Sequence, residues 1–181
     1  MMLLFAHLGL TLATARFIGK ADLAFLALGS MLPDIIDKPL GLIAFGSPNM
    51  GRTFAHTLLF LSLLAALSIY SRDIRLKSMS WGVLVHLALD SMWNSPVTLL
   101  WPLLGNFPKA LHLDTLSYLE AIFSGLRDPG ILIPELLGLS YFIYFVYTRR
   151  SQISAGVKRS LVQPKDRAAT FLQAVLGEFE K

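Results

Sequence analysis

The sequence contains no cysteine among its 181 residues. Disulfide frameworks, thiolate metal sites and cysteine nucleophiles are therefore excluded, and any metal ion must be held by nitrogen and oxygen atoms. The chain also lacks a Gly-x-Ser-x-Gly nucleophile elbow and the glycine-rich fingerprints of P-loop and dinucleotide-binding folds. These absences argue against a serine hydrolase of the α/β type and against a nucleotide-binding domain.

Charged residues are scarce. They make up 15% of the chain, whereas 54% is hydrophobic, and soluble domains carry roughly 25% charge. A chain with so little polar surface is expected to lie in a membrane, with a soluble bundle of buried helices as the alternative. The net charge is +4, but Lys and Arg lie between and after the apolar segments. They do not interleave with aromatics along a groove-like pattern, so no nucleic acid partner is expected.

Long apolar segments predict the fold class. Four of them approach the roughly 20 residues that a transmembrane helix needs: 1–18, 53–70, 81–101 and 131–147. A fifth, 21–32, is too short to span and is predicted to be a tilted or re-entrant helix. We expect it to end at Pro33, since proline disfavours the helical conformation of the preceding residue. The predicted fold is all-α, a multi-spanning membrane bundle of about four transmembrane helices plus this short helix.

The placement of Lys and Arg predicts the orientation, because cytoplasmic loops near membrane spans are enriched in these residues. The basic residues that flank the apolar segments are Arg16, Lys20, Arg72, Arg75, Lys77, Arg149, Arg150, Lys158 and Arg159. The segments that carry them should share the cytoplasmic side, which leaves loops 33–52 and 102–130 on the other side. We therefore expect a multi-pass inner-membrane protein with its N-terminus outside and its C-terminus in the cytoplasm.

The domain organisation follows from the same pattern. Residues 1–150 are predicted to form a membrane-embedded helical metal-binding domain, and 151–181 a basic cytoplasmic tail. Within the tail, 167–179 could form an amphipathic helix on the anionic leaflet or remain solvated. Residues 13–15, Ala-Thr-Ala, resemble a signal-peptide cleavage site, but no Lys or Arg precedes them in the first segment.

Ionisable side chains inside apolar segments are costly, so each needs a partner or a function. His7, His56, His86 and Asp90 all lie in such segments. His86 and Asp90 are four residues apart, which places them on one helix face, one turn apart. This arrangement can present a nitrogen and an oxygen to one ion, and its alternative is a hydrogen bond between imidazole and carboxylate.

Two carboxylates and an arginine extend this set. Asp34 and Asp37 follow Pro33, where an Asp is often a cap or turn former. We predict Asp34 as a metal ligand at the membrane edge and Asp37 as a general base. Arg52 precedes His56 by one turn, and its planar fork suits either an oxyanion or the lipid headgroups.

The predicted topology brings these residues to a similar depth. Asp34 and His56 fall at the outer face, and His7 falls in the outer half of the first segment. His86 and Asp90 fall near the middle of the membrane, slightly outward. Imidazole nitrogens and carboxylate oxygens form a chemically sensible set for a divalent metal, with zinc the expected ion.

Three motifs in this order resemble a known family: Leu-Pro-Asp-Ile-Ile-Asp at 32–37, Arg-Thr-Phe-Ala-His-Thr at 52–57 and His-Leu-Ala-Leu-Asp at 86–90. Preceded by His7, they look like the membrane-bound metal-dependent hydrolase family of bacterial and archaeal inner membranes. The resemblance covers roughly residues 1–105. It implies a metal-dependent hydrolase of the inner membrane.

The same order of residues is similar to the soluble zinc-dependent phospholipase C and single-strand nuclease superfamily. That resemblance implies one zinc on Asp34, His56, His86 and Asp90, and a second on His7 with Asp90 as the bridge. For the superfamily's further zinc, this chain offers only His112, Glu120 and Glu135.

The favoured hypothesis for function is metal-assisted hydrolysis of an ester or phosphoester. A divalent ion lowers the pKa of bound water from about 16 to about 7, with Asp37 as the base and Arg52 as the oxyanion clamp. A site at the outer membrane boundary suits a lipid or lipid-linked substrate, which makes membrane lipids the expected partners. The alternatives are a non-enzymatic metal-binding or transport protein and a scaffold whose polar groups only pair with one another.

Overall fold

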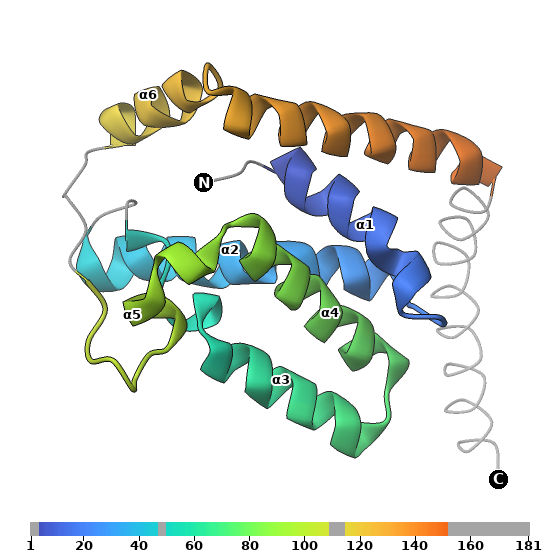
Figure 1. The fold of residues 1–181 in the computed structure, drawn as a ribbon, viewed down its shortest axis with the longest axis horizontal. Coiled ribbons are helices and arrows are strands. Elements are labelled where there is room, and N and C mark those ends of the chain that lie inside the picture. Colours follow the sequence, from blue (N-terminus) through green and yellow to red (C-terminus); the bar gives the residue numbers. More distant parts are fainter. Residues whose placement is uncertain (1–3, 47–49, 109–114, 152–181) are drawn as a thin grey trace, which may run out of the picture. The chain divides into compact units, whose positions relative to one another are not determined.

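The computed structural model describes residues 4–46, 50–108 and 115–151. Within these ranges the chain is helical and contains no strand, so the predicted all-α class is confirmed. The chain divides into two units between Phe142 and Ile143, and each is described by itself. Figure 1 shows the described helices in chain order. The predicted tail helix 167–179 and His112 lie outside the described residues.

The first predicted span is helical but irregular. A π-helical turn, η1 (Ala6–Leu10), is followed by the short α1 (Thr11–Ala13) and a 3-10 turn, η2 (Thr14–Phe17). The Thr14 hydroxyl donates to the Thr11 carbonyl oxygen at 2.7 Å, a local bond that competes with regular helix pairing. The segment 1–18 is therefore not the single regular spanning helix that its hydropathy predicts.

The helix α2 (Leu23–Phe45) corrects two predictions. Its N-cap is Asp22, whose carboxylate accepts the backbone N–H groups of Ala24 and Phe25, and it continues through both Pro33 and Pro39. The short helix 21–32 therefore does not end at Pro33, and the first half of the predicted loop 33–52 is helical. The two prolines deprive only two carbonyl groups of their helical donors, and α2 packs along α4 over much of its length. These tertiary contacts outweigh the local preference.

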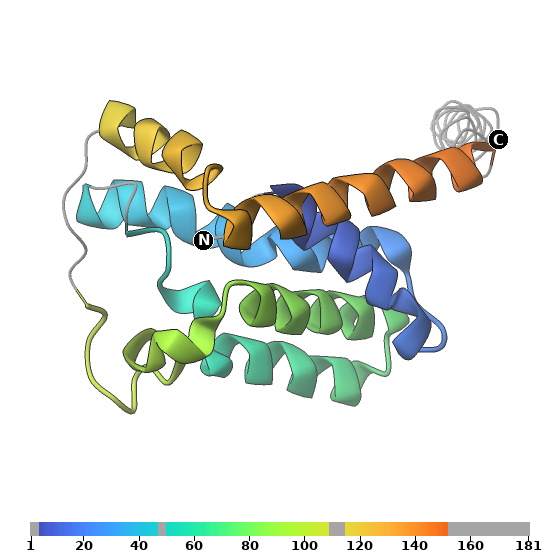
Figure 2. The same ribbon diagram turned by 45° about the horizontal axis from the view of Figure 1, so that its top comes forward.

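The helices α3 (Leu58–Ser71) and α4 (Ile74–Leu89) form an antiparallel pair. They lie side by side in Figures 1 and 2. Side chains from this pair and the following turn form the hydrophobic core: Leu64, Val83, Leu87 and Met92. The predicted span 81–101 stops early because Ser91 takes a left-handed conformation, φ 51°. Shorter elements follow: η5 (Met92–Asn94), α5 (Pro96–Leu99) and α6 (Thr115–Gly125).

Among the described helices, one is long and apolar enough to cross a membrane, Pro129–Ser151. It contains the predicted span 131–147. The helix α3 has 14 residues, or about 21 Å at 1.5 Å per residue, less than the roughly 30 Å of a bilayer core. The helix α2 has 23 residues, but three charged side chains interrupt its apolar sequence. The prediction of four full spans is thus reduced to one.

The helices α2 and α4 approach so closely that their backbones touch. A Cβ atom on Gly29 would overlap the carbonyl oxygen of Met79, and one on Gly82 would lie 2.8 Å from the backbone nitrogen of Ser30. Only glycine fits at such a crossing. This contact places residues 30–37 of α2 against the C-terminal turns of α4, where the candidate site is built.

In the second unit, the structure describes the chain as far as Ser151. Arg149 lies over the ring of Phe145 at 5.2 Å, and Arg150 lies over that of Tyr147 at 4.9 Å. These cation–π contacts hold two basic side chains against aromatic ones at the end of the apolar helix.

Candidate metal centre

His86 has one ring nitrogen committed to the protein backbone. It lies on the last turn of α4 and is fully buried. Its Nδ1 is 2.7 Å from the carbonyl oxygen of Ser30 on α2. A carbonyl oxygen can only accept, so Nδ1 carries the hydrogen and Nε2 of the neutral ring presents a lone pair. The crossing at Gly29 and Gly82 makes this bond possible, because it brings the α2 backbone within reach.

His56 is oriented in the same manner by Asp37. His56 ends the turn η4 (Phe54–His56), and its Nδ1 lies 2.7 Å from Oδ2 of Asp37. Asp37 also accepts the backbone N–H groups of Thr53, Ala55 and His56, at 2.7 to 3.1 Å. Both side chains are completely buried. A carboxylate that holds Nδ1–H of a histidine is a common support for a metal ligand, because it leaves Nε2 free to donate a lone pair.

The two Nε2 atoms face each other. Nε2 of His56 and Nε2 of His86 are 3.2 Å apart. Two lone pairs at this distance repel one another unless a proton or a cation lies between them. In a tetrahedral zinc site with Zn–N bonds of about 2.0 Å, neighbouring ligand atoms are about 3.3 Å apart. The spacing therefore fits two ligands of one ion.

Carboxylate oxygens complete two overlapping donor groups. In the first, Oδ1 of Asp34 lies 3.7 Å from Nε2 of His56. In the second, Oδ1 of Asp90 lies 3.5 Å from Nε2 of His7, and the rings of His7 and His86 are 4.2 Å apart. The donor atoms of each group, Asp34 with His56 and His86, and His7 with His86 and Asp90, lie within 4.8 Å of one another. Either group could hold a divalent ion, but His86, which is common to both, can bind one ion at a time through its Nε2.

Arg52 is paired with one of these carboxylates. Its Nε donates to Oδ2 of Asp90 at 3.0 Å, and its Nη2 lies 2.7 Å from the same oxygen. Oδ2 also lies 3.9 Å from Nε2 of His56. The guanidinium thus compensates the buried negative charge of Asp90.

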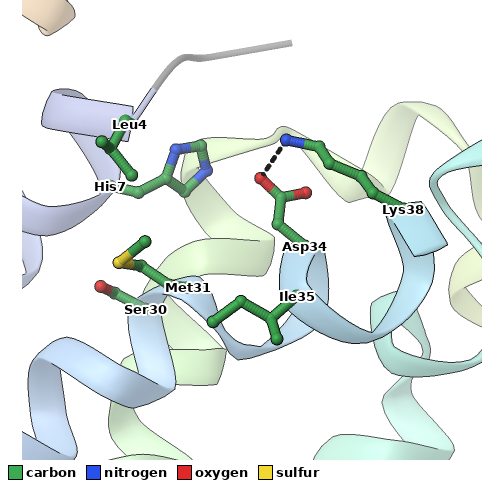
Figure 3. A pocket seen from close by; sticks show the side chains of 7 residues that line it. All are labelled: Leu4, His7, Ser30, Met31, Asp34, Ile35 and Lys38. Carbon is green, nitrogen blue, oxygen red and sulfur yellow. Dashed lines mark hydrogen bonds and ion pairs between the residues drawn. The ribbon is translucent and has the colours of Figure 1, made fainter. Parts of the chain in front are cut away.

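The two donor groups together form one cluster of His and Asp side chains. A cavity of about 210 Å³ opens onto this cluster, and Figure 3 shows it. Its polar walls are His7, Asp34, Ser30 and Lys38, and its apolar walls are Leu4, Met31 and Ile35. Lys38 Nζ donates to Oδ2 of Asp34 at 2.8 Å, one helical turn away. The Asp34 side chain is 25% exposed, whereas His56 is completely buried. The cavity therefore reaches the cluster at His7 and Asp34.

The structure brings all five predicted ligands together and places the two predicted catalytic residues beside them. Sequence reasoning missed the Ser30 carbonyl and the side chain of Lys38. Nothing in the sequence signals a backbone acceptor, but the four-residue spacing from Asp34 to Lys38 is a readable sign of an ion pair. Of the candidates for a further zinc, Glu120 is exposed, and Glu135 binds backbone N–H groups of Phe5 and Ala6.

The match to known proteins agrees with this picture of a membrane chain. The family model described as YdjM inner membrane protein matches residues 2–156. The chain belongs to the YdjM inner membrane protein family. No curated protein and no solved structure matches it. This YdjM chain is thus an inner-membrane protein whose matched region contains the whole cluster, from His7 to Asp90, and also the apolar helix from Pro129.

Proposed function

We propose that this chain is a membrane-bound, metal-dependent hydrolase of an ester or phosphoester, with one or two divalent ions and zinc as the expected metal. The observation that carries the proposal is the pair of Nε2 atoms of His56 and His86, 3.2 Å apart. Both rings have Nδ1 committed to an acceptor. A cation between these nitrogens removes the repulsion of their lone pairs and accounts for the carboxylates around them.

The roles of the chain's own residues follow from their contacts. A divalent ion bound here would supply Lewis acidity and a water of lowered pKa. Arg52 holds Asp90 in its ionised form. Both oxygens of Asp37 are engaged by N–H donors, which favours the positioning of His56 over the general-base role that its sequence position suggested. The engagement of Arg52 by Asp90 likewise favours support of a ligand over an oxyanion clamp.

The charges around the cluster favour an anionic substrate. Asp34, Asp37 and Asp90 are opposed by Lys38 and Arg52, so a single divalent ion makes the neighbourhood positive when the histidines are neutral. The apolar walls of the cavity suit an acyl or isoprenoid chain. We therefore propose a lipid or lipid-linked phosphoester that reaches the site from the membrane.

The membrane arrangement completes the proposal. Pro129–Ser151 meets the criteria for a full span, and we propose that it crosses the inner membrane with the basic C-terminal tail in the cytoplasm. The apolar α3 is too short to cross and is proposed to lie within the bilayer. The basic residues at the end of this helix and after it, Arg149, Arg150, Lys158 and Arg159, support this placement of the tail.

Elemental analysis of the detergent-purified full chain tests the metal. We expect one or two zinc ions per chain in the wild type and in Val83→Ala, a control for a buried residue of the same helix. We expect less than a tenth of that content in His86→Ala. Metal-free wild type that is stable and unaffected by chelator would remove the proposal and select the scaffold alternative.

Activity is tested on the same preparations. A panel of nitrophenyl esters, nitrophenyl phosphoesters and short-chain lipid phosphoesters should show turnover that chelator abolishes and zinc restores. The His86→Ala variant should be inactive, and Val83→Ala should be active. Bound metal without turnover on any member of the panel would select the non-enzymatic metal-binding alternative.

A further inference from the structure

Glu135 is a buried carboxylate in the long apolar helix that could cross a membrane. It lies in Pro129–Ser151 and is 8% exposed. Its Oε1 accepts the backbone N–H of Phe5 at 2.8 Å, and its Oε2 accepts that of Ala6 at 2.9 Å. A carboxylate in such surroundings is costly unless charged hydrogen bonds compensate it. These two bonds tie the beginning of the first helical segment to the last apolar helix.

The same face of the apolar helix makes two further contacts with that segment. A Cβ atom on Gly9 would overlap the carbonyl oxygen of Gly138, and one on Gly138 would overlap that of Phe5. One turn farther on, the rings of Phe142 and Phe5 lie 6.4 Å apart. Glu135, Gly138 and Phe142 are spaced three and four residues apart, so they lie along one face of the helix. Contacts with this face therefore oppose both the sliding of the first segment along the apolar helix and its movement away from that helix.

His7 directly follows the two residues whose N–H groups Glu135 binds. Its side chain is buried, with Nε2 3.5 Å from Oδ1 of Asp90 and its ring 4.2 Å from that of His86. A small rotation or shift of the backbone at Phe5 and Ala6 would move the His7 ring away from Asp90. The bonds to Glu135 oppose such movement.

We propose that Glu135 is a positioning residue that holds His7 in the metal centre. The apolar helix would then complete the second donor group, His7 with His86 and Asp90, without supplying a ligand of its own. Both oxygens of Glu135 are engaged by backbone donors, which favours this role over the direct binding of a further ion. The inference rests on the proposed metal function in so far as His7 is a ligand.

A double-mutant cycle tests the proposal in the detergent-purified full chain, with Co²⁺ as the probe. Glu135→Gln replaces one acceptor oxygen with an amide N–H₂ that opposes a backbone donor. We expect a roughly tenfold weaker Co²⁺ affinity, as for the loss of other supports of ligands, and a change in the Co²⁺ absorption spectrum. His7→Ala should produce a comparable change. In the His7→Ala background, Glu135→Gln should weaken binding no further.

Amide hydrogen exchange provides a readout that does not depend on metal. In Glu135→Gln, the peptide that contains Phe5 and Ala6 should exchange faster, whereas α2 and α4 should be unchanged. Glu120→Gln, at an exposed position of α6, is the matched control and should behave as wild type in both measurements. If the wild type binds no metal but Glu135→Gln still accelerates the N-terminal exchange, the proposed metal function fails, whereas the role of Glu135 in holding the N-terminal segment does not.

Two results would overturn the positioning role. One is unchanged N-terminal exchange in Glu135→Gln. The other is a loss of Co²⁺ affinity that is as large in the His7→Ala background as in the wild type, because Glu135 would then act independently of His7.

Discussion

Two close helix crossings at glycine residues bring the candidate metal ligands together, and they differ in the number of ligands that their helices carry. At the first, Gly29 of α2 meets α4, and at the second, Gly9 of the N-terminal segment meets Gly138 of the apolar helix. The first crossing joins helices that both carry donor side chains, including Asp34 and His86. The second joins one candidate donor, His7, to a helix that carries none of the five candidate ligands.

The two crossings are also stabilised by different hydrogen bonds. At the first, the histidine itself makes the bond between helices, from Nδ1 of His86 to the Ser30 carbonyl oxygen. At the second, the bond is made by Glu135, which contacts the backbone beside His7. Loss of the first crossing should therefore remove both donor groups. Loss of the second should remove one and leave Asp34, His56 and His86 in place.

The largest effect is expected for Gly82→Ala. The added Cβ would lie 2.8 Å from backbone atoms of Gly29 and Ser30, so α2 and α4 must separate. We expect a loss of about 3 kcal/mol in the free energy of unfolding, as for strong overpacking, and no bound zinc. Thermal unfolding and elemental analysis measure the two effects.

Gly125→Ala is the control for Gly82→Ala, because its nearest neighbour would be a side-chain atom of Ile131 at an ordinary 3.4 Å. This control should retain wild-type zinc content. A Gly82→Ala variant with unchanged zinc content would show that the close approach of α2 and α4 is not needed for the site.

An intermediate and selective effect is expected for Gly138→Ala. Its Cβ would overlap the Phe5 carbonyl oxygen, which should displace the N-terminal segment and with it His7. If the wild type binds two ions, we expect one to be lost and the other to remain on Asp34, His56 and His86. Zinc titration by calorimetry distinguishes this outcome. Loss of both ions would mean that the two crossings are not independent.

The sequence predicted which candidate donors lie together better than it predicted the helices that carry them. His86 and Asp90 could be placed on one helix face from their spacing alone, and the cost of burying ionisable groups selected His7 and His56. The path of α2 could not be predicted, because the local effect of Pro33 is outweighed by packing along α4. The number of membrane spans was overestimated because hydropathy does not detect the turns at Thr14 and Ser91, which interrupt two of the predicted spans.

The supports of the site were harder to predict than its donors for a physical reason. Ser30 acts through its carbonyl oxygen, and Glu135 acts on the N–H groups of Phe5 and Ala6. Backbone groups are the same at every residue, so the sequence carries no sign of which ones will be used. Glu135 nevertheless satisfies the rule that selected His7, since it too is an ionisable residue in an apolar segment.

The smallest effect is expected for Lys38→Met, which extends the comparison from buried to exposed supports. Lys38 holds Asp34 on the cavity side, and its side chain is 40% exposed. Exposed ion pairs contribute 1 kcal/mol or less because solvent screens them. We therefore expect a change in unfolding free energy of about 0.5 kcal/mol or less and a zinc affinity within about threefold of the wild type. A loss of zinc affinity as large as that expected for Glu135→Gln would show that Asp34 depends on the exposed Lys38 for its position as much as His7 depends on the buried Glu135. Burial would then not be what distinguishes the supports of this site.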